Sequence, residues 1–222
     1  MIAVTRVVWV VTDQSAHHAF MVRWVERVAQ DLLAPHPAQR SSGEDVQVRH
    51  IFVEKRFMKA QNARECLIRL RRSIQDPRAP VLLFCDSECR DEERFREAGR
   101  GMAALVKELR AQHAHVHGLV FNPMSEGSWL LFDEALVTVG AALPGWREPE
   151  DLHRLKRDRQ RGVWVSKDRV NEVFQLDRHK RLLNDAVTES TFGAGLPDCP
   201  HAPYQRALAE LRSLLRLAWA LG

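Results

Sequence analysis

Residues 80–88 read Pro-Val-Leu-Leu-Phe-Cys-Asp-Ser-Glu, and this stretch decides the fold. Its apolar run shows no polar alternation, which predicts a strand buried on both faces of a parallel sheet. Two acidic residues, Asp86 and Glu88, follow at the carboxyl end of that strand, where ligands bind in open parallel sheets. The stretch therefore predicts a central strand with a candidate site beside it.

Strands and helices alternate on either side of this stretch. Three more short apolar runs predict strands, and amphipathic segments between the four strands predict helices with an apolar stripe. The predicted strands are 6–11, 46–53, 80–85 and 116–121, and the predicted helices are 16–33, 60–74 and 90–112. This β-α-β order predicts an α/β fold, a three-layer sandwich whose mostly parallel central sheet lies between two helical layers.

The pattern changes after Leu143, so we expect an α/β domain over residues 1–143 and a C-terminal extension over 144–222. The extension is basic and mainly helical, with no linker long enough to free it, and we expect it to dock on the core. Residues 163–165 are a candidate short strand, and residues 170–187 are expected to be mostly helical. A loop is expected over 188–203 and a final helix over 204–221.

Composition excludes several classes of protein. The chain has 222 residues, 45% of them hydrophobic and 28% charged, which is typical of a globular protein and not of a disordered or fibrous one. It contains no apolar run long enough to span a membrane and no signal-peptide pattern at its start. With only four cysteines, we expect a cytoplasmic protein with reduced thiols and no membrane partner. No Gly-rich phosphate-loop motif occurs, so ATPase and dinucleotide sites are not supported.

Acidic residues follow three of the predicted strands. Asp13 comes after the first strand, Asp86 and Glu88 after the third, and Glu126 after the fourth. Carboxylates gathered at one edge of a sheet can hold Mg²⁺ or Mn²⁺, which prefer oxygen ligands and can stabilise charge on a phosphate during phosphodiester cleavage. The alternative is structural, because acids at strand ends also cap the next helix.

A basic tract in the extension is a candidate nucleic-acid surface. The net charge of +4 is compatible with such a partner. The cations could contact a phosphate backbone, and a nearby tryptophan could stack on a base. The alternative is a solvated helix whose charge is balanced by neighbouring aspartates. The residues are Arg154, Lys156, Arg157, Arg159, Arg161 and Trp164.

The cysteines allow one further interpretation. Cys85 and Cys89 on one side, and Cys199 and His201 on the other, could supply four ligands to a structural zinc ion. Their spacing is poor for such a site, and a cysteine within a buried strand is usually a small apolar group.

The strand order and the acids after the third strand resemble a TOPRIM domain, the metal-binding module of topoisomerases, primases and several nucleases. Residues 126–133, Glu-Gly-Ser-Trp-Leu-Leu-Phe-Asp, are similar to the Glu-x-Trp-Leu-Leu-x-Asp segment of small TOPRIM-like proteins of bacterial defence and mobile-element loci, with one residue more. The resemblance implies a TOPRIM or Rossmann-like sheet over about residues 4–140, with Asp86 and Glu88 as metal ligands. It also implies Asp13 as the acid/base, where the family usually has Glu, and Glu126 in support.

The function expected from this resemblance is a nucleic-acid-associated protein, acting as a Mg-dependent nuclease component of a bacterial antiviral defence system. The alternative is a catalytically inactive scaffold or adaptor subunit of a larger protein or nucleoprotein complex. The absence of the usual Glu after the first strand favours this alternative. Trp146, Trp164 and Trp219 could then anchor a protein partner, because aromatic residues are enriched at interface hot spots.

Overall fold

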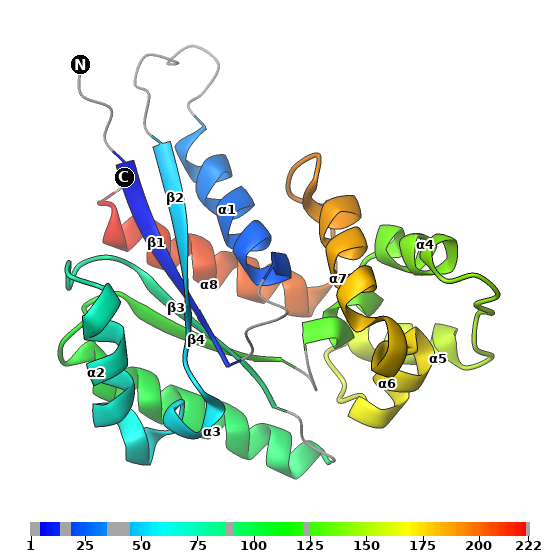
Figure 1. Ribbon diagram of the computed structural model, residues 1–222, viewed down its shortest axis with the longest axis horizontal. Helices are drawn as coiled ribbons and strands as arrows, with labels where there is room; N and C mark the ends of the chain where they lie inside the picture. The colour runs from blue at the N-terminus through cyan, green and yellow to red at the C-terminus, as the bar shows by residue number, and fades with distance from the viewer. Residues whose placement is uncertain (1–4, 14–18, 35–44, 88–90, 122–124, 221–222) are drawn as a thin grey trace.

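Four parallel strands form the centre of the molecule, in the order β2-β1-β3-β4 (Figure 1). The computed structural model describes residues 5–13, 19–34, 45–87, 91–121 and 125–220. The strands are β1 (Thr5–Thr12), β2 (Asp45–Phe52), β3 (Val81–Asp86) and β4 (Val116–Phe121). The predicted parallel sheet is confirmed, and β3, the strand of the deciding stretch, is buried along its whole length.

Helices cover both faces of the sheet, as the alternation of side chains along β1 shows. Val8 and Val10 pack with α1 and α8 on one face, whereas Trp9 and Val11 pack with α2 and α3 on the other. The bounds of these helices are α1 (Ala19–Leu33), α2 (Ala63–Ser73), α3 (Glu92–Arg110) and α8 (Ala202–Ala218). Two short 3-10 helices, η1 (Lys55–Phe57) and η2 (Ala60–Asn62), connect β2 to α2. The arrangement is the expected three-layer sandwich.

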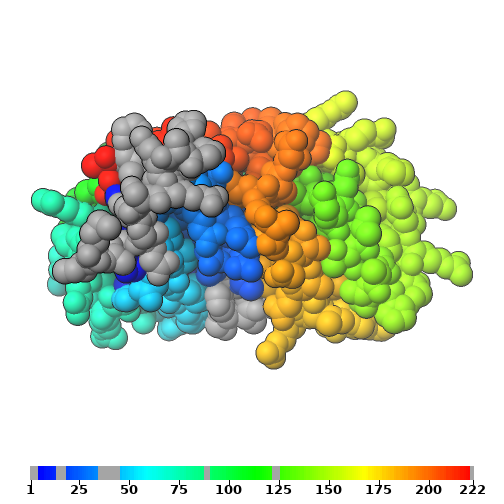
Figure 2. All heavy atoms as spheres, turned by 90° about the horizontal axis from the view of Figure 1, so that it is seen from above, coloured from blue at the N-terminus to red at the C-terminus, as the bar shows by residue number. Residues whose placement is uncertain are grey.

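The segment between β4 and α8 forms a helical unit at one end of the molecule. Its helices are η3 (Ser125–Leu131), α4 (Asp133–Ala142), α5 (Leu152–Gln160), α6 (Lys167–Phe174) and α7 (Leu176–Phe192). Trp129 of η3 is fully buried, and its ring packs edge to face against the Phe174 ring with the two ring centroids 5.3 Å apart. In Figure 2, α7 (orange) lies between α1 (blue) and the green and yellow helices. The mainly helical character of the extension is therefore confirmed.

Two local predictions in this unit are wrong. Residues 163–165 form no strand, because the chain there only links α5 to α6 and has no neighbouring strand to pair with. Residues 170–187 are mostly helical, as expected, and belong to two helices that meet where Gln175 adopts a left-handed backbone with φ of 50°. The loop expected from residue 188 is the second wrong prediction. The second of these helices, α7, continues to Phe192 and takes in residues that were expected to be loop, since Thr188, Thr191 and Phe192 are buried.

The last helix returns to the sheet. α8 completes the layer begun by α1, and Tyr204 lies 6.1 Å from the Trp24 ring, centroid to centroid. One apolar core runs from Val8 in the first strand to Leu215 in the last helix. The boundary at residue 143 stays a prediction, and the extension supplies one helix of the sandwich itself. Over the described ranges, no helix combines the length and apolar character needed to cross a membrane.

Candidate functional site

Asp13 and Asp86, two of the predicted acids, both lie at the carboxyl edge of the sheet. Thr12 pairs with Phe84 across β1 and β3, so the residue that follows β1 lies level with Cys85. The Cys85 thiol donates a hydrogen bond to Asp13 Oδ2 at 3.2 Å, and the backbone N–H of Asp86 donates to the same carboxylate. Parallel pairing therefore places two acids that are far apart in the chain at one edge of the sheet, where the Asp13 carboxylate contacts the Asp86 backbone. The convergence of their two carboxylates on one ion stays a prediction.

Burial sets the chemistry of these two carboxyl groups. Asp86 is only 2% exposed, and Asp13 is half-buried. Loss of hydration raises the pKa of Asp13, while the Cys85 hydrogen bond, the Lys55 charge and the Asp86 amide oppose that rise. Asp13 consequently holds its proton to a higher pH than an exposed aspartate does, which suits a group that transfers protons.

Lys55 is a third functional side chain at this edge, and sequence reasoning missed it. It begins η1, just after β2, and its Nζ lies 2.6 Å from the backbone oxygen of Asp86 and 3.4 Å from that of Ser87. β2 neighbours β1 in the sheet, so residues after β2 reach the same edge as Asp13. A search for cations after the predicted strands, in addition to acids, would have found it.

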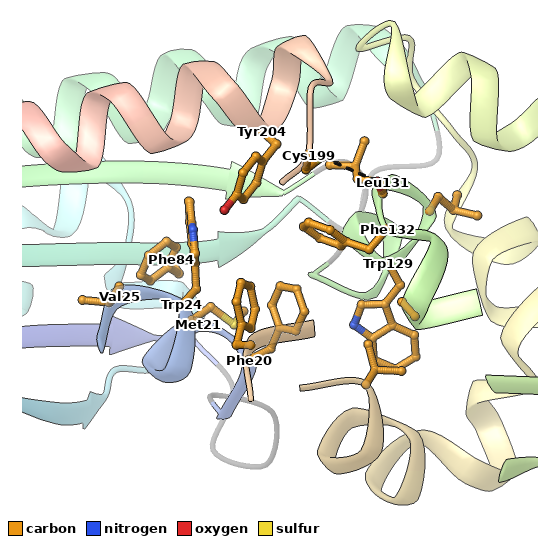
Figure 3. Close-up of a cluster of buried hydrophobic side chains, with 14 of the residues drawn as sticks. Phe20, Met21, Trp24, Val25, Phe84, Trp129, Leu131, Phe132, Cys199 and Tyr204 are labelled. Atoms are coloured by element: carbon orange, nitrogen blue, oxygen red, sulfur yellow. Dashed lines mark hydrogen bonds between the residues drawn. The ribbon is translucent and has the colours of Figure 1, made fainter. Parts of the chain in front are cut away.

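Cys85 is held as a thiol in this arrangement, donating to Asp13. Burial raises the pKa of its thiol far above the ordinary value, and the neighbouring Asp13 raises it further, so the thiolate is not formed at neutral pH. Of the other residues considered for zinc, Cys89 lies outside the described residues. Cys199 is buried and directs its thiol to the Leu131 carbonyl oxygen at 3.5 Å, as the dashed line in Figure 3 shows.

Glu126 pairs with a lysine of the extension. It lies at the start of η3 with 0% exposure, and its Oε1 is 2.8 Å from Nζ of Lys180 on α7. This contact joins η3 to α7, and the supporting role expected of Glu126 stays a prediction. Glu88 lies outside the described residues. Among the residues that are described, no three His, Cys, Asp or Glu side chains form a cluster suited to a metal ion.

The basic tract does not form one continuous face. Arg154 and Lys156 make surface ion pairs, with Asp151 at 3.3 Å and with Asp133 respectively. Arg157 and Arg161 are exposed. Arg159 turns inward and is buried, so it cannot reach a phosphate backbone on the surface. Trp164, the predicted stacking residue, is half-buried.

Three comparisons bear on what this chain is similar to. No protein-family model, no curated protein and no solved structure matched it. The resemblance to TOPRIM domains therefore stays a prediction that depends on the residues quoted above. Any functional conclusion must come from the geometry of the chain itself.

Proposed function

We propose that this cytoplasmic protein is a TOPRIM-like, nucleic-acid-associated protein that acts as a Mg-dependent nuclease component of a bacterial defence system. The observation that supports this proposal is the Asp13 carboxylate at the carboxyl edge of β1 and β3, where it accepts hydrogen bonds from the Cys85 thiol and the Asp86 backbone amide. Open parallel sheets bind their ligands at this edge. A half-buried acid with a raised pKa at such an edge is typical of a reactive site.

Asp13 and Asp86 would hold a Mg²⁺ or Mn²⁺ ion, with Glu88 as the further ligand that the sequence predicts. Two carboxylates suffice, because proteins bind Mg²⁺ through one or two carboxylates together with waters and substrate phosphates. The ion would orient a phosphate and stabilise the charge that develops on it. The Lys55 ammonium at this edge repels a divalent cation. A bound phosphate offsets that positive charge, so we expect the ion to bind more tightly when a phosphate is present.

The other roles belong to the chain's own side chains. Lys55 is placed to pair with a phosphate oxygen of the substrate, since its ammonium is held over the end of β3. Asp13 can accept or return a proton, because its raised pKa brings it closer to neutrality than an exposed aspartate. Arg157 and Arg161, both exposed, are available to the phosphate backbone. Arg154 and Lys156 could exchange their surface ion pairs for phosphates at little cost.

The test is cleavage of plasmid DNA and of RNA by the purified chain with Mg²⁺ or Mn²⁺, together with titration of Mn²⁺ by calorimetry. Asp86→Asn and Asp13→Asn preserve side-chain shape and should lower the cleavage rate by about 10²-fold or more. Asp168→Ala removes an exposed acid of α6 and serves as the control that keeps full activity. Cleavage that Asp86→Asn leaves unchanged, or the absence of Mn²⁺ binding, would overturn the proposal.

A second candidate is the catalytically inactive scaffold or adaptor subunit. The pairing of Glu126 with Lys180 favours it, because one expected site acid holds two helices together. Two of the tryptophans considered as partner anchors pack within the chain: Trp146 Nε1 donates to the Val173 carbonyl oxygen at 2.9 Å, and Arg6 lies over the Trp219 ring. Co-purification with a partner protein that Asp86→Asn does not disturb, without cleavage activity, would support this candidate over the nuclease.

A further inference from the structure

A cavity of about 280 Å³ opens beside the carboxyl end of β4, on the side away from Asp13 and Lys55 in the order of the sheet. Aromatic rings from several elements make up much of its lining. Figure 3 shows four of them facing one another: Phe20 and Trp24 of α1, Phe132 after η3, and Tyr204 of α8. The volume is just below the range typical of ligand sites, about 300–1,000 Å³, which suits a small molecule with a flat ring.

Arg159 brings a positive charge to this apolar cavity. It comes from the last turn of α5, lines the cavity and is only 7% exposed. In the described part of the chain no carboxylate, carbonyl or hydroxyl pairs with it, and its Nε is buried without a hydrogen-bond partner. Burial alone lowers the pKa of Arg159 to about 10, so no neighbouring charge compensates for the lost hydration.

An unpaired guanidinium in such a place is unusual, because buried charges in proteins are nearly always paired or hydrogen-bonded. Among the described residues the one acid that lines the cavity, Glu210, is directed to His117 with 3.1 Å between Oε2 and Nε2. A second cation, Arg206, lies next to Gly162, where an added Cβ would be 3.4 Å from its guanidinium nitrogen. Among its described residues the lining thus has two arginines and one acid, and that acid is directed to His117 and not to Arg159.

We propose that this cavity binds a small aromatic anion, whose ring packs among the side chains of α1 and α8 and whose acidic group pairs with Arg159. Guanidinium groups bind carboxylates and phosphates through two parallel hydrogen bonds, which satisfies the donors that the fold leaves unused. Arg206, which lies beside Gly162, would pair with any negative charge of the ligand that Arg159 leaves unpaired. The aromatic ring of the ligand would pack edge to face against the lining rings, as Phe20 and Phe192 pack against each other with centroids 4.9 Å apart.

The test uses the full chain and two sources of this chemistry. Benzoate and phenylacetate represent aromatic carboxylates, adenosine and uridine monophosphates represent nucleotides, and inorganic phosphate represents the charge alone. Calorimetry should show saturable binding of at least one aromatic anion, and Arg159→Met should weaken it by about tenfold or more. Arg178→Met, which replaces an exposed arginine of α7, is the control and should bind as the parent chain does.

Two further measurements keep the outcome decisive. Without ligand, Arg159→Met should raise the melting temperature, since it removes a buried charge that has no partner. Ala207→Phe, which fills the cavity from α8 and keeps Arg159, should also abolish binding, so the conclusion does not depend on one variant. The proposal is overturned if no aromatic anion binds below about 1 mM. It is equally overturned if phosphate alone binds as tightly, or if Arg159→Met binds as the parent does. None of these results depends on Asp13 or Asp86, so they are independent of the proposed nuclease.

Discussion

The buried ion pair between Glu126 and Lys180 gives the sharpest stability prediction. Glu126 is fully buried, and the Lys180 side chain is 24% exposed. Lys180→Met keeps the length of the side chain and leaves the carboxylate without its cation. Breaking a buried pair in this way costs about 3–5 kcal/mol, and the partial exposure of Lys180 favours the lower figure of about 3 kcal/mol.

A double-mutant cycle separates the free energy of the Glu126–Lys180 interaction from the other effects of each substitution on stability. Glu126→Gln combined with Lys180→Met removes both charges, so we expect the double variant to be more stable than the sum of the two single losses predicts, by about 1–3 kcal/mol. The control is Lys156→Met, which breaks the exposed pair with Asp133, whose side chain is 77% exposed, and should cost less than about 1 kcal/mol.

Urea unfolding followed by tryptophan fluorescence measures the free energy of unfolding of the parent chain, the two single variants and the double variant. The chain has six tryptophans whose fluorescence reports unfolding. The comparison is valid where the slope of the free energy against urea stays constant among the variants. A loss below about 1 kcal/mol for Lys180→Met, or strictly additive losses in the cycle, would refute the structural role assigned to Glu126.

Three other predictions follow from local contacts and charges. Gly118→Ala should lower the free energy of unfolding by about 1–3 kcal/mol in the same urea assay, because the added Cβ would lie 2.6 Å from Met102 Cγ, and the smaller side chain of Met102→Ala should relieve part of that loss. The parent chain should lose stability as the pH rises from 3.8, the ordinary pKa of aspartate, through the raised pKa of folded Asp13, because the folded state holds the proton more tightly. Asp13→Asn has no proton to lose there, so it should become increasingly stabilising relative to the parent chain. A difference in free energy of unfolding between the two chains that stays constant with pH would contradict this. Tyr204 is the sole tyrosine, and burial raises its pKa to about 12, so absorbance titration of the folded chain should show no phenolate step near pH 10.

The sequence predicts the sandwich well because its strands are short, apolar and separated by amphipathic helices. The run at 80–85 can be buried on both faces only inside a layered fold, and β3 has that position. The break at Gln175 was not predictable, since a left-handed backbone at a glutamine depends on the packing of α6 and α7 around it and not on local propensity.

The site was predictable where it depends on sheet topology. Asp13 and Asp86 lie at the same edge because the carboxyl ends of parallel strands share one edge of the sheet, which the β-α-β order implies. The pairing of Glu126 was not predictable because its partner, Lys180, belongs to a helix of the extension, and no pattern along the chain indicates which helix packs on η3. The inward turn of Arg159 was hidden for a similar reason: in sequence it is one of several cations in a basic tract.

The most direct measurement for the proposed site is a crystal structure of the chain grown with Mn²⁺ and recorded at an energy where manganese scatters anomalously. The account predicts an anomalous peak at the carboxyl edge of β1 and β3, within about 2.0–2.3 Å of carboxylate oxygens of Asp13 and Asp86. A map that shows both carboxylates ordered, with Lys55 beside them and no manganese between them, would contradict it.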